Sequence, residues 1–171
     1  MNRAALVILF LATLLAACGK ANNEGIVAYN AQKVIDDKIV ADYLTANPGL
    51  VAKKIDTSGV YYIVQDPGSG NAIFTNSTMV TVGYTGRLLY NSNTKQYSGK
   101  VFTQTDKFHP SFTLQQVILG WRLGIPKIKK DGTVRLLIPS RYAYGPNEQP
   151  LLGLPANAIL DFDITLYDII N

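Results

Sequence analysis

The sequence predicts an α+β fold, with several antiparallel strands, one short helix within their run, and a longer helical segment before them. Two observations predict it. From Gly59 to the C-terminus hydrophobic residues repeat with a period of two, as in half-buried strands, and between residues 34 and 44 they repeat at helical spacing. The 171 residues, 47% of them hydrophobic, are enough for one packed domain and an additional segment.

Residues 1–17 resemble a secretory signal peptide. Arg3 precedes the apolar run Ala4–Ala17, which is shorter than the roughly 20 apolar residues that a transmembrane helix needs. The run leads into Leu15-Ala16-Ala17-Cys18-Gly19, which resembles the bacterial lipobox, whose cysteine becomes the lipid-bearing first residue. We therefore expect Cys18 to be the lipid-attachment residue of a bacterial lipoprotein, anchored to a membrane that it does not span.

The residue after Cys18 is glycine, and in proteobacterial lipoproteins the absence of aspartate there favours sorting to the outer membrane. The expected location is the bacterial cell envelope, on the outer membrane and facing the periplasm. Cys18 is also the only cysteine, so an intramolecular disulfide, a redox pair or a zinc site has no second thiol. The stretch Lys20–Gly25 is small and polar, which predicts a tether over residues 18–27.

Residues 28–57 are predicted to form a helical linker segment that is stopped by Asn47-Pro48-Gly49. One side carries Val34, Ile35, Ile39, Val40, Tyr43 and Leu44, and the other carries Lys33, Asp36, Asp37 and Asp42. The segment has two interpretations: it packs on its own domain as a spacer, which we favour, or it forms a homodimer through residues 28–46. The globular domain is expected over residues 58–171.

Within that domain, strands are expected over residues 60–65, 79–89, 101–104, 133–139 and 158–170. Residues 91–100 are polar and are expected to form a tip-like insertion. The stretch Thr113-Leu114-Gln115-Gln116 has the spacing of a capping box, with threonine first and glutamine three residues later. It is expected to open the short helix, which carries Trp121 and ends before Pro126.

The titratable residues do not predict acid–base, metal or nucleic-acid chemistry. His109 is the only histidine, so a catalytic triad or a metal site would lack its partners. Asp161 and Asp163 share one face of a strand, and we interpret them as an outward-facing edge rather than a catalytic pair. The formal charge of +4 comes from scattered residues, without the dense basic stripe of a nucleic-acid site. We expect no metal, no cofactor and no nucleic-acid partner.

The aromatic residues carry a family resemblance. In order, the chain contains Val82-Gly83-Tyr84-Thr85-Gly86, Val101-Phe102, Phe112-Thr113-Leu114, Val117-Ile118-Leu119-Gly120-Trp121, Ile138-Pro139, Tyr142-Ala143-Tyr144-Gly145, Leu154-Pro155-Ala156-Asn157 and Leu160-Asp161-Phe162-Asp163-Ile164-Thr165-Leu166. These blocks resemble the FKBP-type peptidyl-prolyl isomerases, and the match runs from about Gly59 to the C-terminus. The resemblance implies an antiparallel half-barrel wrapped around one short helix, and an isomerase that assists the folding of exported proteins.

The resemblance also implies roles for ten residues. Trp121 would be the platform beneath a substrate proline, and Tyr144 would offer its hydroxyl to the amide oxygen. The residues with implied catalytic roles are Tyr84, Phe102, Trp121, Tyr144 and Phe162, and those with implied substrate-binding roles are Thr103, Phe112, Val117, Ile118 and Leu154. The chain departs from the family pattern in two places. Thr103 stands where most members have aspartate, and Leu151-Leu152 stands where the flap usually has polar residues.

The expected partners are proline-containing polypeptides that are unfolded or partly folded. Two other functions remain open on the sequence. A non-catalytic, peptide-binding periplasmic chaperone would use the same apolar pocket without accelerating isomerisation. A purely structural lipoprotein would not use the pocket at all, and would tolerate alanine at Trp121 and Phe102.

Overall fold

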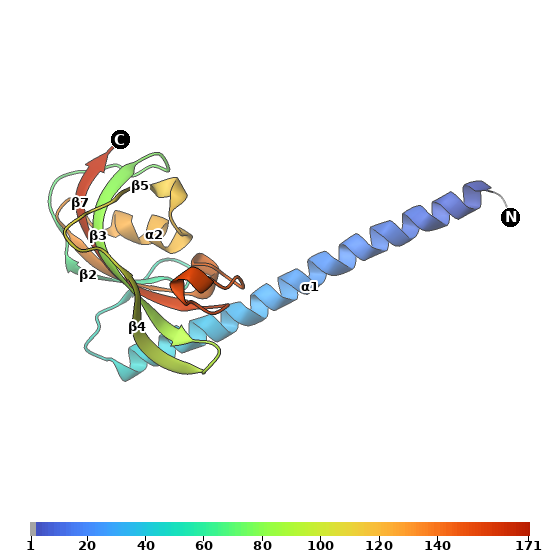
Figure 1. Ribbon diagram of the computed structural model, residues 1–171, viewed down its shortest axis with the longest axis horizontal. Helices are drawn as coiled ribbons and strands as arrows, with labels where there is room; N and C mark the ends of the chain where they lie inside the picture. Colours follow the sequence, from blue (N-terminus) through green and yellow to red (C-terminus); the bar gives the residue numbers. More distant parts are fainter. Residues whose placement is uncertain (1–2) are drawn as a thin grey trace. The chain divides into compact units, whose positions relative to one another are not determined.

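The computed structural model describes the backbone of residues 3–171 and the side chains of residues 23–171 (Figure 1). The chain divides into two compact units, Met1–Ile35 and Asp36–Asn171. Helix α1 (Arg3–Ala46) runs through the first unit and ends in the second. The predicted lipid-attachment residue Cys18 lies outside the described side chains. Within the described part of the chain, no helix combines the length and hydropathy needed to cross a membrane.

Helix α1 continues through residues 18–27, where the sequence predicts a tether. Gly19 and Gly25 are the two glycines in that stretch, and a single glycine costs a helix only about 1 kcal/mol relative to alanine. The end of the helix at Ala46 agrees with the predicted stop at Asn47-Pro48-Gly49.

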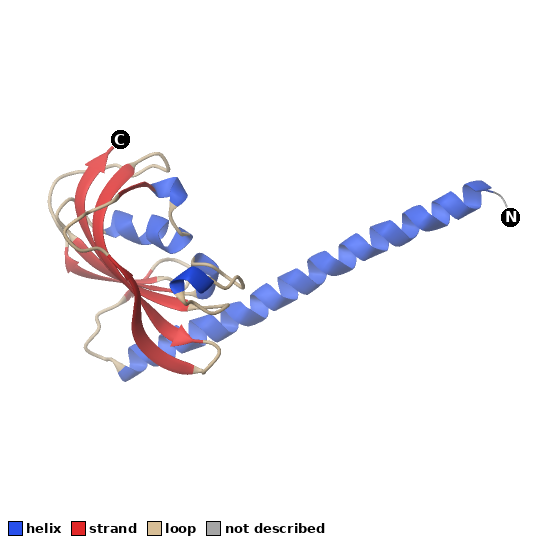
Figure 2. Ribbon diagram, viewed as in Figure 1, coloured by secondary structure: helices blue, strands red, loops and turns tan. Residues whose placement is uncertain are grey.

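The second unit is built on a seven-stranded antiparallel sheet (Figure 2). The strands lie side by side in the order β1 (Lys53–Lys54), β2 (Tyr61–Asp66), β6 (Thr133–Ile138), β7 (Ile159–Ile170), β3 (Met79–Asn91) and β4 (Gln96–Gln104), and β5 (Ser111–Thr113) pairs with β3. This arrangement confirms the predicted α+β fold. The polar stretch 91–100, predicted as a tip-like insertion, forms the tip of the β3–β4 hairpin. Its residues can be polar because β4 is an edge strand whose residues are mostly exposed.

One face of the sheet curls around the short helix α2 (Leu119–Gly124) (Figure 1). Two glycines let α2 lie close to β6, because a Cβ atom on Gly120 would collide with Ile138 and one on Gly124 with Leu136. The main hydrophobic core fills this side. Its fully buried members include Val80, Val82, Ile125, Val134, Leu136, Ile138, Leu160, Ile164 and Leu166.

The predicted capping box is wrong. Thr113 is the last residue of β5, and its side chain makes no capping hydrogen bond to the 3-10 helix η1 (Leu114–Gln116) that follows. The N–H groups of Leu114 and Gln115 instead donate to the carbonyls of Thr78 and Asn76, at 3.0 and 2.9 Å. Because a neighbouring loop satisfies these donors, the turn needs no side-chain cap.

The other face of the sheet receives the end of α1. Val40 is fully buried there in a second core with Leu89, Leu137 and Ile159. The hydroxyl of Tyr97, on β4, donates to the carbonyl of Ile39 at 2.8 Å. The spacer interpretation, in which the helical segment packs on its own domain, therefore describes residues 36–46.

The expected polar side of this segment is not fully exposed. Asp36 is 0% exposed, whereas Val34 and Ile35, placed on the apolar side by the sequence pattern, are 67% and 50% exposed. The burial of Asp36 is possible because polar groups meet it, since the hydroxyl of Ser140 donates to its carboxylate at 2.7 Å.

Asp161 and Asp163 do not form an outward-facing edge, so this interpretation is wrong. They lie on β7, which is paired on both sides by β6 and β3. Asp161 is 3% exposed and accepts two hydrogen bonds of 2.9 Å from Arg135, which raise the pKa of that guanidinium. Arg87 donates to Asp163 at 2.6 Å. Both carboxylates are therefore structural partners of arginines.

Candidate active site

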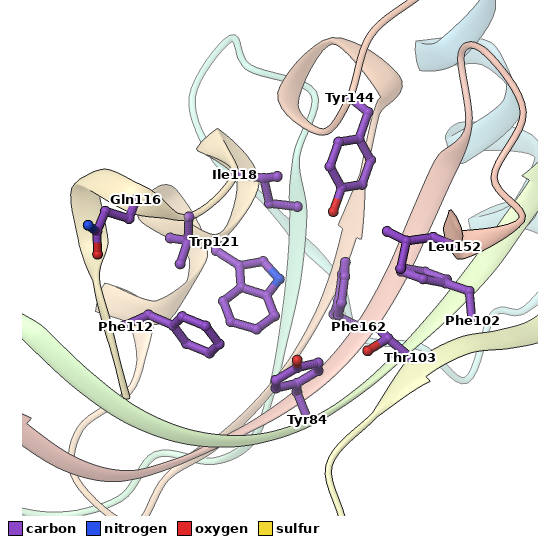
Figure 3. Close-up of a pocket in the computed structure, with 11 residues that line it drawn as sticks. Tyr84, Phe102, Thr103, Phe112, Gln116, Ile118, Trp121, Tyr144, Leu152 and Phe162 are labelled. Atoms are coloured by element: carbon purple, nitrogen blue, oxygen red, sulfur yellow. The ribbon is translucent and has the colours of Figure 1, made fainter. Parts of the chain in front are cut away.

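An uncharged aromatic pocket of about 330 Å³ opens between α2 and the sheet that curls around it (Figure 3). It is lined by Tyr84, Phe102, Thr103, Phe112, Gln116, Val117, Ile118, Trp121, Tyr144, Leu152 and Phe162. None of these side chains is an acid, a base or a histidine. The pocket can therefore hold an apolar group by shape and desolvation, with a few hydroxyl and amide groups to orient it.

Trp121 forms the floor of this pocket. The indole is 5% exposed and meets the rings of Tyr84 and Phe162 edge to face, with centroid distances of 5.0 and 5.2 Å. Its Nε1 atom is buried without a hydrogen-bond partner among the described residues, and Figure 3 shows this nitrogen on the side facing Phe162. The ring is thus held by aromatic contacts and not by a hydrogen bond, and its faces give the pocket an apolar floor.

The sheet supplies the wall opposite α2 through one row of paired residues. Gly86 on β3 pairs with Thr103 on β4 and with Phe162 on β7. A Cβ atom on Gly86 would lie 2.5 Å from the ring of Phe162, 2.8 Å from Thr103 and 3.0 Å from Phe102. The glycine therefore leaves the space in which these three side chains gather.

Gly86→Ala is expected to lower the free energy of unfolding by about 1 to 3 kcal/mol, because the added methyl group overpacks the wall and displaces Phe162. Thermal unfolding measures the loss of stability. Quenching of Trp121 fluorescence by a proline-containing peptide measures how well the pocket still binds that peptide. Gly49→Ala is the matched control, since a Cβ atom there meets nothing within 4 Å. Equal effects of the two substitutions would contradict the packing role of Gly86.

The mouth of the pocket is formed by the ends of other elements. Tyr144 follows the 3-10 helix η3 (Ser140–Tyr142), and Figure 3 shows its hydroxyl directed into the pocket. Burial, with a smaller effect of Tyr84, raises the pKa of Tyr144, so its hydroxyl stays protonated and able to donate at neutral pH. Ile118 is the N-cap residue of α2, so its N–H lies outside the helical hydrogen-bond ladder.

The structure brings together every residue predicted for the pocket except Leu154. Leu154 is 3% exposed and belongs to the main core, while Leu152, at the end of the 3-10 helix η4 (Pro150–Leu152), lines the pocket. The chain reverses between them at Gly153, whose φ of +65° is left-handed. Glycine after an apolar pair was the one sequence signal for this reversal.

Gln116 and His109 were not among the residues predicted for the pocket. Gln116 lines the pocket and was not predicted, because a single glutamine at the end of a 3-10 helix carries no periodic signal. His109 lies between β4 and β5, where its ring stacks on Tyr167 at 4.0 Å, and it is not among the residues that line the pocket. Its interpretation as a loop residue agrees with this position.

An antiparallel sheet curled around a short helix, with an uncharged aromatic pocket between them, defines a class of site that can hold an apolar group and has no acid–base residue in its lining. The family model described as FKBP-type peptidyl-prolyl cis-trans isomerase matches residues 70–167. The chain belongs to this family. The match confirms the resemblance that the aromatic blocks indicate.

The individual proteins with which the chain aligns support the family match. The chain is 39% identical over 120 residues to the FKBP-type peptidyl-prolyl cis-trans isomerase FkpA of Buchnera aphidicola, covering 69% of this chain and 45% of that relative. It is 39% identical over 100 residues to FK506-binding protein 1 of Candida glabrata, covering 58% of this chain and 83% of that relative. The crystal structure of FkpA from Escherichia coli aligns with a TM-score of 0.65 and 27% identity, over 99% of this chain and 73% of that one. The chain thus spans less than half the length of the Buchnera relative.

Proposed function

We propose that this protein is a peptidyl-prolyl cis-trans isomerase that assists the folding of exported polypeptides. The observation that carries the proposal is the uncharged aromatic pocket with Trp121 as its floor. A proline ring is an apolar group of the size that such a cavity accepts. The rings of Tyr84 and Phe162, which meet the indole edge to face, would help to hold the proline over Trp121. Its substrates would be Xaa-Pro bonds in unfolded or partly folded chains.

The pocket has the properties that this reaction needs. Rotation about the amide bond has a barrier of about 18 to 20 kcal/mol because resonance must be broken, and it takes tens to hundreds of seconds without a catalyst. The planar amide is strongly dipolar and the twisted transition state is less so. An apolar cavity therefore disfavours the ground state more than the transition state. A useful enzyme needs a difference of roughly 5 to 7 kcal/mol, without any proton transfer.

The polar groups of the pocket serve mainly to position the substrate. A hydrogen bond from the Tyr144 hydroxyl to the amide oxygen favours the planar amide, so it would hold the substrate rather than accelerate rotation. Thr103 contributes a hydroxyl where most family members have a carboxylate. It can form a hydrogen bond but it adds no charge to the pocket, which stays uncharged throughout its described lining.

The assay that tests the proposal follows cis-to-trans conversion of a Leu-Pro or Phe-Pro peptide by the purified protein. We expect acceleration in proportion to protein concentration. The chaperone alternative, which the isomerase names of the relatives do not favour, predicts no acceleration together with suppressed aggregation of an unfolded client. That pair of results would end the enzyme proposal.

We also propose that Cys18 carries a lipid and anchors the protein to the outer membrane, facing the periplasm. The lipobox-like sequence Leu15-Ala16-Ala17-Cys18 and the following glycine support this proposal. Residues 1–17 would be removed as a signal peptide, residues 18–27 would lie nearest the membrane, and residues 58–171 would form the isomerase domain.

Replacement of Cys18 by serine is expected to move the protein from the membrane fraction to the soluble fraction, because a hydroxyl cannot take the thioether-linked lipid. Fractionation followed by mass spectrometry of the N-terminal peptide makes the comparison. After purification in detergent, the parent protein and Cys18→Ser should have the same isomerase activity, since Cys18 is outside the domain that holds the pocket. A wild-type protein that is soluble and carries no lipid mass would contradict the anchor.

A second copy of the chain is proposed as a partner through residues 28–46. The exposed apolar side chains of Val34 and Ile35 support this proposal, whereas Val40 is fully buried in its own domain. Sedimentation equilibrium of the purified protein distinguishes one copy from two.

A further inference from the structure

A buried charge network joins the end of helix α1 to the turn that follows β6. The carboxylate of Asp36, 0% exposed, accepts a hydrogen bond of 2.7 Å from the hydroxyl of Ser140 and lies 3.7 Å from Nη1 of Arg141. The Nη2 atom of Arg141 donates to Asp37 at 2.6 Å and to the carbonyl of Ser58 at 2.5 Å. The helix and the turn are 104 residues apart in the sequence.

Gly59 leaves the space that this network occupies. Gly59 has a φ of +84°, and a Cβ atom there would collide with both Arg141 and Asp37. The side chain of Arg141 is only 4% exposed, so its charge depends on these partners rather than on water. Displacing any one of these partners would leave a desolvated charge behind, so the network disfavours other arrangements of these side chains.

Ser140 is the residue on which the following turn is organised. Its carbonyl accepts hydrogen bonds from the N–H groups of Ala143 and Gly145, at 2.9 and 2.8 Å. Tyr144 lies between these two donors, and Gly145 is in turn fixed by its carbonyl, which accepts from Asn157 at 2.8 Å. The backbone around Tyr144 is therefore fixed relative to Ser140.

The side chain of Tyr144 leaves this turn and directs its hydroxyl into the pocket (Figure 3). Its ring is only partly buried, and the described residues include no hydrogen-bond partner for its hydroxyl that would hold it there. The location of the hydroxyl thus depends on the backbone of the turn. A continuous series of contacts leads from Asp36 through Ser140 to Tyr144.

We propose that Asp36 is a positioning residue for Tyr144, so that the end of helix α1 sets where the hydroxyl lies at the mouth of the pocket. This inference rests on the proposed function, because it assigns to Tyr144 the role of orienting the substrate amide. Under it, the helical segment is a working part of the isomerase domain as well as a spacer. Asp36 does not touch the substrate.

A double-mutant cycle tests this relation. Asp36→Ala is expected to raise KM by about 3- to 10-fold with little change in kcat, because a misplaced hydroxyl weakens substrate binding without altering the apolar floor. In the Tyr144→Phe background the same substitution should change KM by less than about 2-fold, since the hydroxyl it acts through is absent. Asp36→Asn keeps an oxygen that can accept from Ser140, so it should restore most of the binding.

Tyr43→Phe is the matched control. It removes a hydrogen bond of 3.0 Å between the same helix and Arg135 of the sheet, away from the turn that carries Tyr144. It should lower the melting temperature while KM stays within about 2-fold of the parent. A loss of stability in Asp36→Ala with unchanged KM would overturn the proposal, and so would an equal rise in KM in the Tyr144→Phe background.

A second measurement does not depend on isomerase activity. In nuclear magnetic resonance spectra, the amide signals of Ala143, Tyr144 and Gly145 should shift in Asp36→Ala and remain in place in Tyr43→Phe. If the parent protein proves inactive, the proposed function fails, but these shifts still decide whether Asp36 positions Tyr144. Unshifted signals in folded Asp36→Ala would overturn the proposal whatever the activity.

Discussion

Asp161→Ala is expected to lower the free energy of unfolding by about 3 kcal/mol, the lower end of the cost of breaking a buried ion pair. The substitution removes the acceptor of both 2.9 Å hydrogen bonds from Arg135 and leaves that guanidinium without its charge partner. The lower end applies because the side chain of Arg135 is 20% exposed, so water can partly solvate the guanidinium charge that is left without its partner. Chemical denaturation with urea measures the change.

Asp163→Ala is the matched control for this prediction, two residues along the same strand and on the same face. Asp163 is paired with Arg87 at 2.6 Å, but its side chain is 31% exposed where that of Asp161 is 4% exposed. Its removal should cost less than about 1 kcal/mol. If both substitutions cost the same, burial does not determine the strength of these ion pairs.

The strands and the faces they bury could be predicted from the sequence, because side-chain alternation is a local property. Val80 and Val82, two residues apart in the strand expected over residues 79–89, are both fully buried in β3. The pocket required more than periodicity. Phe102, Trp121 and Phe162 come from three elements, and only the order and spacing of the aromatic blocks, compared with a known family, indicated that they meet.

The buried polar residues could not be predicted, since each depends on a partner far along the chain. Asp161 was interpreted as an exposed edge, and its partner Arg135 is 26 residues away on a neighbouring strand. Asp36 was placed on the polar side of its helix, but it meets Ser140 in the interior. A helical or alternating pattern cannot distinguish a solvated carboxylate from one that a distant donor satisfies.

Trp121→Ala is expected to reduce kcat/KM by about 100-fold, which corresponds to roughly 2.7 kcal/mol of transition-state stabilisation. The substitution removes the floor of the pocket and admits water to the site of the amide. Trp121→Phe keeps an aromatic floor of smaller area, so a loss of about 10-fold is expected. The measurement is the isomerase assay, at a temperature well below the melting temperature of each variant.

Stability and activity must be separated here, because Trp121 is also a core residue and its truncation costs about 3 to 5 kcal/mol of unfolding free energy. Leu166→Ala provides the comparison, because Leu166 is fully buried in the same core but does not line the pocket. This substitution should lower the free energy of unfolding by about 2 to 5 kcal/mol. Its kcat/KM should stay within about 2-fold of the parent while the protein is folded. If Leu166→Ala lost as much activity as Trp121→Ala, the indole would be acting through the stability of the core, and a specific role as the floor of the pocket would be wrong.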